Sequence, residues 1–130
     1  MALSFQAGWR PTLIRRVEEC FDTGSDVVAV VSNEGCGFAK FLGNREGPHV
    51  LACELIGTRM AHLLGLPTFD HALVDYDGIP EIELYGGSQA APGPAWITRR
   101  EEGFTWSGKD TDLALLHNRA DVAKLVALDT

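Results

Sequence analysis

The amino-acid sequence predicts an α+β fold, with a twisted, mostly antiparallel sheet of about five strands and one main helix packed on it. The first observation is a β-branched run of strand length, Val27–Ser32, followed after a glycine-containing turn by a second strand-like run, Phe38–Leu42. The second is a helical segment between Pro48 and Gly65. The third is composition: with 45% hydrophobic and 22% charged residues, a chain of 130 residues can bury the core of one globular domain.

The two strand-like runs predict an antiparallel hairpin, because only the short turn Asn33–Gly37 separates them. On the second strand, Phe38, Lys40 and Leu42 share one face, and Ala39 and Phe41 share the other. The segment before the hairpin, 10–19, is short and mixed. Its apolar residues fit one face of a strand or one face of a helix, and the sequence leaves both interpretations open. These residues are Leu13, Ile14 and Val17.

The helix has clear start and stop residues. Pro48 suits the first helical turn, Gly65 suits the position just after the last turn, and Pro67 lies just beyond. An approximate apolar stripe runs along it, made of Leu51, Leu55, Met60, Leu63 and Leu64. Such a stripe indicates a helix that packs one face on the sheet.

Three further strands are expected after the helix. Leu66–Val74 predicts a loop leading into the third strand, and Ile79–Leu84 predicts an edge strand. The stretch Gly86–Pro94 is rich in glycine and proline and predicts a loop, and Ala95–Thr98 predicts the fifth strand.

The C-terminal part changes character. Thr111–Leu116 is weakly helical, and Asn118 can cap a new helix with Asp121 in its first turn. The helical pattern still continues at Thr130, which favours a continuation beyond this residue over a frayed terminal helix.

Charge and cysteine content narrow the function classes. A net charge of −7 offers no positive surface for a phosphate backbone, so we expect no nucleic-acid binding by the chain itself. The three cysteines form no CxxC pair, which favours reduced thiols over a disulfide or zinc scaffold. We find neither a signal-peptide pattern nor an apolar run of membrane-spanning length, so we expect a cytoplasmic protein without membrane contact.

Lys40 and Glu54 are the pair of residues that suggests chemistry. Lys40 lies in the middle of a strand and must reach the surface or find a partner, and Glu54 follows fourteen residues later on the helix. A lysine held by a carboxylate at a cleft is how kinases grip the phosphates of ATP, and the upstream glycine turn could cover those phosphates. The alternative is an edge-strand lysine and a solvated glutamate. No metal-ligand spacing or nucleophile elbow is present, so we expect no metal site.

Five segments occur in a definite order: Lys40-Phe41, Gly43-Asn44, Glu54-Leu55-Ile56, Leu64-Gly65-Leu66-Pro67 and Gly93–Arg99. Together they resemble the N-terminal, ATP-binding lobe of HipA-like kinases, which are bacterial serine/threonine-type kinases. The resemblance covers most of residues 24–130. It implies a protein-kinase-like N-lobe, with the start of the C-lobe helices in the last residues, and a single domain over residues 1–130.

The resemblance also implies roles for individual residues. Lys40 would contact the phosphates of ATP, and Glu54 would orient Lys40. Gly24 and Ser25 would belong to the phosphate-covering loop. The backbone around Ile97, Thr98 and Arg99 would meet the adenine.

The chain departs from the family where catalysis takes place. The family's catalytic Asp loop and its Mg ligands have no counterpart here, so no residue of this chain is expected to be catalytic or to bind metal. We therefore expect a kinase portion that binds ATP, is inactive alone, and belongs to a larger protein acting on a protein substrate or under a regulator. The alternative is a stand-alone, non-catalytic interaction module that binds a separate catalytic half or a regulator. A third interpretation is an unrelated α+β domain with Lys40 and Glu54 as surface charges.

Overall fold

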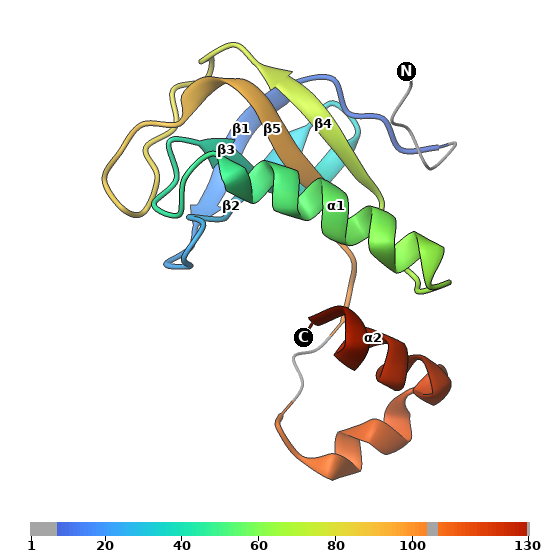
Figure 1. Ribbon diagram of the computed structural model, residues 1–130. Helices are drawn as coiled ribbons and strands as arrows, with labels where there is room; N and C mark the ends of the chain where they lie inside the picture. Colours follow the sequence, from blue (N-terminus) through green and yellow to red (C-terminus); the bar gives the residue numbers. More distant parts are fainter. Residues whose placement is uncertain (1–7, 104–106, 130) are drawn as a thin grey trace. The chain divides into compact units, whose positions relative to one another are not determined.

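A computed structural model describes residues 8–103 and 107–129 of the chain (Figure 1). The chain divides into two compact units. The first contains the residues up to Leu55 together with Phe69–Arg100, and the second contains Ile56–Thr68 together with the residues from Glu101 onward.

The first unit is built on a five-stranded antiparallel sheet with the strand order β1-β2-β3-β5-β4 (Figure 1). The strands are β1 (Ile14–Cys20), β2 (Val28–Ser32), β3 (Gly35–Leu42), β4 (His71–Tyr76) and β5 (Ala91–Arg99). With the helix α1 (His49–Leu63), this arrangement confirms the predicted α+β class, the antiparallel sheet and the hairpin of β2 and β3.

The two faces of the sheet differ, as the alternation along β3 predicts. Ala39 and Phe41 are fully buried, whereas Phe38, Lys40 and Leu42 point to the other face and are half-buried. The buried face carries the main apolar core, in which the ring centres of Phe41 and Tyr76 lie 5.0 Å apart and the ring planes are inclined at 65°. The core consists of Trp9, Ile14, Val28, Val30, Ala39, Phe41, Val74, Tyr76, Ile82, Leu84, Ala90, Ala95 and Ile97.

The predicted edge strand over Ile79–Leu84 is wrong. This segment forms a single bridge, between Glu83 and Gln89, and joins no strand of the sheet. Its alternation is real, because Ile82 and Leu84 are both buried. They cover the core from a loop that closes through hydrogen bonds from the Leu84 amide to Ser88 O and from the Ala90 amide to Ile82 O. The place of this edge strand in the five-stranded sheet is taken by β1, a segment for which the sequence allowed either a strand or a helix.

The loop predicted over Gly86–Pro94 is too long, because β5 already begins at Ala91. Pro92 and Pro94 are exposed, and the residues between and beyond them turn inward. Their missing amide donors are tolerated because the pairing of β5 with β3 is irregular here, between the pairs Lys40↔Trp96 and Leu42↔Ala91.

The helix α1 ends as predicted. Gly65 has a φ of +73°, which favours glycine. Its amide donates to His62 O and the Leu66 amide donates to Ala61 O, so the last carbonyls of the helix are satisfied by a Schellman motif. The apolar stripe is only partly used: Leu51 is buried, whereas Met60 and Leu63 are exposed.

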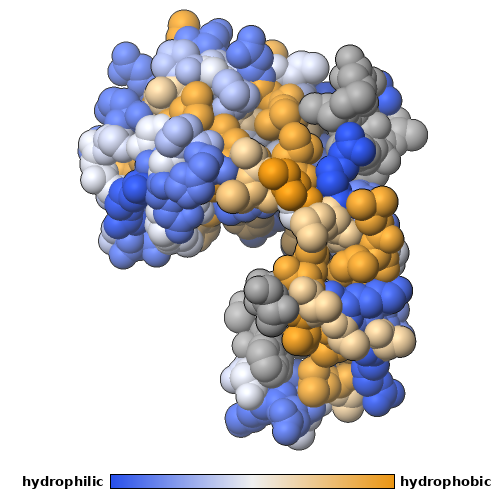
Figure 2. All heavy atoms as spheres, viewed as in Figure 1, coloured by the Kyte–Doolittle hydropathy of each residue, from blue (hydrophilic) through white to orange (hydrophobic). Residues whose placement is uncertain are grey.

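The second unit contains, after α1, two 3₁₀ helices and the helix α2. They are η1 (Asp110–Leu115), η2 (Arg119–Asp121) and α2 (Val122–Asp129). Asn118 precedes η2 as expected, but its side chain makes no capping bond and donates instead to Asp121 Oδ2. Apolar side chains remain on the surface of this unit, and the space-filling view shows them (Figure 2). They include Leu113, Leu115, Leu116, Leu125 and Val126.

Replacing Tyr76 by phenylalanine is expected to flatten the loss of stability at high pH. The Tyr76 hydroxyl donates to Pro80 O, and burial, followed by the charges of Asp77 and Glu81, raises the pKa of this phenol above its ordinary value of 10.0. When the pH rises above 10.0, Tyr76 loses its phenolic proton more readily in the unfolded chain than in the folded chain. The contribution of Tyr76 to the free energy of unfolding is therefore complete below pH 10.0 and is lost as the pH rises through the pKa of the folded state.

Urea unfolding at pH 8 and pH 11 checks this expectation. At pH 8, Tyr76→Phe should have a free energy of unfolding about 1 kcal/mol lower than the wild-type chain, because phenylalanine lacks the hydroxyl that donates to Pro80 O. Its further loss at pH 11 should be smaller than that of the wild-type chain. An equal further loss in both proteins would show that Tyr76 does not contribute to alkaline unfolding.

Candidate functional site

Lys40 stands on the central strand of the sheet. β3 is paired on one side with β2 and on the other with β5, where Trp96 is the Cα partner of Lys40. The Lys40 side chain is 25% exposed and lies on the face opposite the main core. A rigid strand with neighbours on both sides therefore fixes the base of this side chain.

Glu54 comes from the first half of α1. Val50, one turn earlier on the same side of the helix, is buried, and Glu54 is half-buried. Packing of this side brings Glu54 Oε1 into contact with Lys40 Nζ, and the two form an ion pair. The pairing expected from a strand lysine and a helix glutamate is therefore present, and the two charges do not point apart into solvent.

The turn between β1 and β2 holds the next two candidate residues. Ser25 is buried, and Gly24 is exposed beside Glu46. The turn closes through hydrogen bonds from the Asp26 amide to Thr23 O and from the Val27 amide to Thr23 Oγ1. A side chain at position 24 would meet the carboxylate end of the Glu46 side chain, which is flexible and can move aside.

The last three candidates lie at the end of β5. Ile97 is fully buried in the main core, as the Cα partner of Ala39. Thr98 donates from Oγ1 to Phe38 O at 3.5 Å, and the Arg99 guanidinium pairs with Asp70 at 3.2 Å. Both β3 and β4 flank this part of β5. The structure thus brings Lys40 and Glu54 together and gives the three β5 residues partners of their own.

Sequence reasoning missed one cluster beside these residues. Arg45, which follows Gly43-Asn44 in the loop after β3, binds Asp22, Thr23 and the fully buried Asp26. The hydrogen bonds and the nearby carboxylates raise the pKa of Arg45 further above its ordinary value. The only hint in the sequence is an aspartate within a β-turn and an arginine within a loop, which is too common a pair to single out.

Neither a metal cluster nor a membrane helix is found in the described part of the chain. No group of three or more His, Cys, Asp or Glu residues within 8–103 and 107–129 could hold a metal ion. Over the same residues, no helix has both the length and the apolar character required to cross a bilayer.

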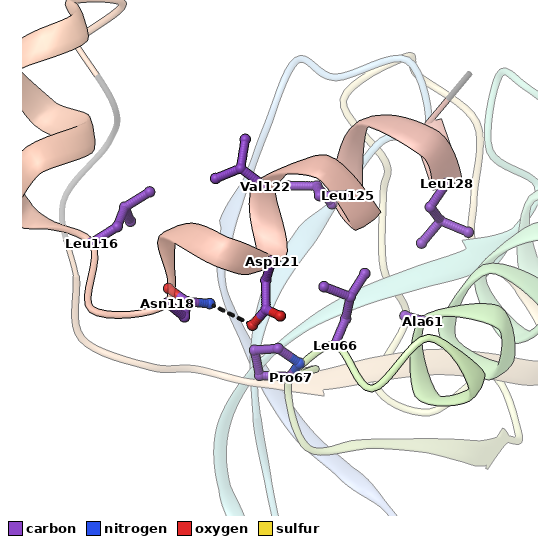
Figure 3. Close-up of a pocket in the computed structure, with 9 residues that line it drawn as sticks. All are labelled: Ala61, Leu66, Pro67, Leu116, Asn118, Asp121, Val122, Leu125 and Leu128. Carbon is purple, nitrogen blue, oxygen red and sulfur yellow. Dashed lines mark hydrogen bonds between the residues drawn. The ribbon is translucent and has the colours of Figure 1, made fainter.

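Among the hollows in the described residues are two that have neither Lys40 nor Glu54 in their lining. One, of about 490 Å³, lies in the first unit beside Leu13, Arg15, Asp77 and Ile79. The other, of about 210 Å³, belongs to the second unit and has a mainly apolar wall (Figure 3). Its polar residues, Asn118 and Asp121, are hydrogen-bonded to each other, so they offer little to a charged ligand.

Comparisons with protein-family models, with curated proteins and with solved structures find no match to this chain.

Proposed function

We propose that this chain is the ATP-binding portion of a HipA-like kinase, and that phosphoryl transfer from ATP belongs to the full protein. The observation that carries the proposal is the ion pair between Lys40 on β3 and Glu54 on α1. A kinase uses this combination of a strand lysine and a helix glutamate to hold the phosphates of ATP.

The geometry suits that role. The Lys40 side chain is 25% exposed, so a ligand phosphate can approach it, and the ion pair with Glu54 limits the positions that its ammonium can take. Its base is fixed by a paired strand, which reduces the entropy lost when a phosphate binds. The described residues fit the phosphates of ATP better than the Mg²⁺ that accompanies them, because they include no group of three or more His, Cys, Asp or Glu side chains that could hold a metal ion. The Mg²⁺ ligands and the catalytic base are expected in the rest of the full protein.

Replacing Lys40 by methionine tests the proposal. Methionine keeps the length of the side chain and removes the charge, so ATP affinity should fall by roughly 10–100-fold, since a hydrogen bond to a charged group contributes about 1.5–3 kcal/mol. Glu54→Gln should weaken binding less, because it leaves the ammonium in place. Isothermal titration with ATP measures both effects.

Lys124→Met is the matched control, because Lys124 is an exposed lysine with its own carboxylate partner, Asp121, in the second unit. It should bind ATP as the wild-type chain does. Equal affinities of the wild-type chain and Lys40→Met, or no ATP binding by the wild-type chain, would contradict the proposal.

A stand-alone interaction module is the second candidate function. The observation that favours it is the set of exposed apolar side chains on the second unit, such as Leu115, Leu125 and Val126 (Figure 2). An independent module should keep its last helix stable without further chain. Hydrogen exchange over residues 119–130 tests this, and rapid exchange throughout that segment would count against the module.

A further inference from the structure

We propose that Arg45 is a positioning residue: it fixes the β1–β2 turn, defined here as residues 21–27, in the conformation that receives the phosphates of a nucleotide. The geometry of the turn stands by itself, and the identity of the ligand rests on the proposed function.

Arg45 holds the turn first through Asp26. The Asp26 side chain is fully buried, and its backbone has a φ of +52°, which is unusual for a residue other than glycine. Its Oδ1 accepts from Arg45 Nε at 2.7 Å, and its Oδ2 accepts from the Arg45 amide at 2.9 Å. Both carboxylate oxygens are therefore bound by one residue of the loop that follows β3.

The same guanidinium reaches the other side of the turn. Arg45 Nη2 donates to Asp22 Oδ1 at 2.7 Å and to Thr23 O at 2.9 Å. The contacts at residues 22, 23 and 26 enclose Gly24-Ser25, the two residues proposed to face the phosphates. A single planar side chain thus fixes both ends of the segment that contains them.

The loop that carries Arg45 is itself anchored. Asn44 is buried and donates from Nδ2 to Phe41 O at 2.7 Å, while its Oδ1 accepts from the Gly47 amide at 3.0 Å. Ser88 Oγ donates to Gly43 O at 2.6 Å, and the Arg45 guanidinium lies 5.9 Å from the centre of the Tyr85 ring. Arg45 is therefore a fixed support, held from β3 and from the 84–88 turn.

Lysine cannot reproduce this arrangement. Its ammonium can still pair with the buried Asp26, but it lacks the rigid fork that reaches Asp22 and Thr23 as well. Arg45→Lys should therefore keep the fold and loosen the turn. If the loosened turn is in the receiving conformation about one-tenth of the time, the apparent ATP affinity falls about tenfold.

Two measurements on the same variant test the proposal. Hydrogen exchange should accelerate in Arg45→Lys at the turn amides of Asp26 and Val27, which are hydrogen-bonded in the wild-type chain. Titrations should show ATP affinity reduced about tenfold and adenosine affinity unchanged, because adenosine has no phosphates for the turn to receive. Asp22→Asn, which leaves the Asp26 pair intact, should show a smaller change in the same direction.

The control is Arg16→Lys, because the Arg16 side chain is 66% exposed and forms an ion pair with Glu18 at 3.7 Å. It should match the wild-type chain in every measurement. Unchanged ATP affinity in Arg45→Lys, or an equal loss of ATP and adenosine affinity, would overturn the positioning role while ATP binding by the wild-type chain stands. A wild-type chain that binds no ATP would overturn the proposed function, and this inference with it.

Discussion

Arg45→Ala is expected to cause the largest loss in the free energy of unfolding, because it leaves the fully buried carboxylate of Asp26 without the guanidinium, itself 44% exposed, that pairs with it. Asp26 is the reason, because its side chain is fully buried and the Arg45 side chain supplies its only ion pair in the described structure. Alanine keeps the hydrogen bond from the backbone amide of residue 45 to Asp26 Oδ2, and it removes the positive charge that offsets the buried carboxylate. Urea unfolding at pH 7 measures the difference.

Two variants separate this cause from a general effect of losing a large side chain. Asp22→Ala removes the exposed partner, at 61% exposure, and should cost less than about 1 kcal/mol. Asp26→Asn combined with Arg45→Ala should recover much of the loss. The asparagine is neutral, tolerates the positive φ, and keeps an acceptor for the amide of residue 45.

The double variant decides the interpretation. If it is as unstable as Arg45→Ala, the buried carboxylate is not the source of the loss, and the contact of the Arg45 guanidinium with the Tyr85 ring would account for it. If it is clearly more stable, the charge is the source. The Arg45–Asp26 ion pair would then contribute little net free energy to folding, and its main effect would be to hold the turn in one conformation.

The parts of the fold that the sequence predicted correctly depend on local patterns. From Gly37 to Leu42, β3 alternates strictly between buried and half-buried residues, and α1 is bounded by Pro48 and Gly65. The candidate pair could be predicted because the alternation fixes the face of Lys40 and because Glu54 interrupts an apolar helix. Their contact needs only this strand, this helix and the loop between them.

The parts that the sequence left open or predicted wrongly depend on pairing between distant segments. β1 carries register shifts between Ile14 and Arg16 and between Val17 and Glu19, so Ile14, Val17 and Cys20 face inward at a spacing of three. That spacing is also the spacing of a helix. In the segment 79–84 the pattern misleads in the other direction. Its residues alternate as in a strand, but they form a loop whose apolar side chains cover the core.

The Arg45 cluster could not be predicted for a similar reason. Nineteen residues separate Arg45 from Asp26, and no local pattern brings an arginine of one loop to a carboxylate of another. Asp26 is buried where the loop that carries Arg45 meets the β1–β2 turn, and only the folded chain brings these two segments together.

Phe41→Ala should be the second most costly substitution, with an expected loss of about 3–5 kcal/mol in the free energy of unfolding. Phe41 is fully buried on the central strand, and its ring packs edge-on against Tyr76. Alanine would leave a cavity that the neighbouring strands cannot close, since β2 and β5 are both held to β3 by ladders of hydrogen bonds. Chemical denaturation at neutral pH measures the loss.

Phe38→Ala is the matched control, because Phe38 lies on the same strand and points to the face of Lys40. Phe38 is half-buried, with its ring 6.1 Å from that of Phe21, so we expect a loss of about 1–2 kcal/mol. The same change of residue type on one strand cancels the difference in strand propensity, so the comparison isolates burial. Equal losses would mean that the face of Lys40 is as much a core as the other. A clear difference would mean that stability resides mainly on the Phe41 face, which leaves the face of Lys40 and Glu54 free to serve a ligand.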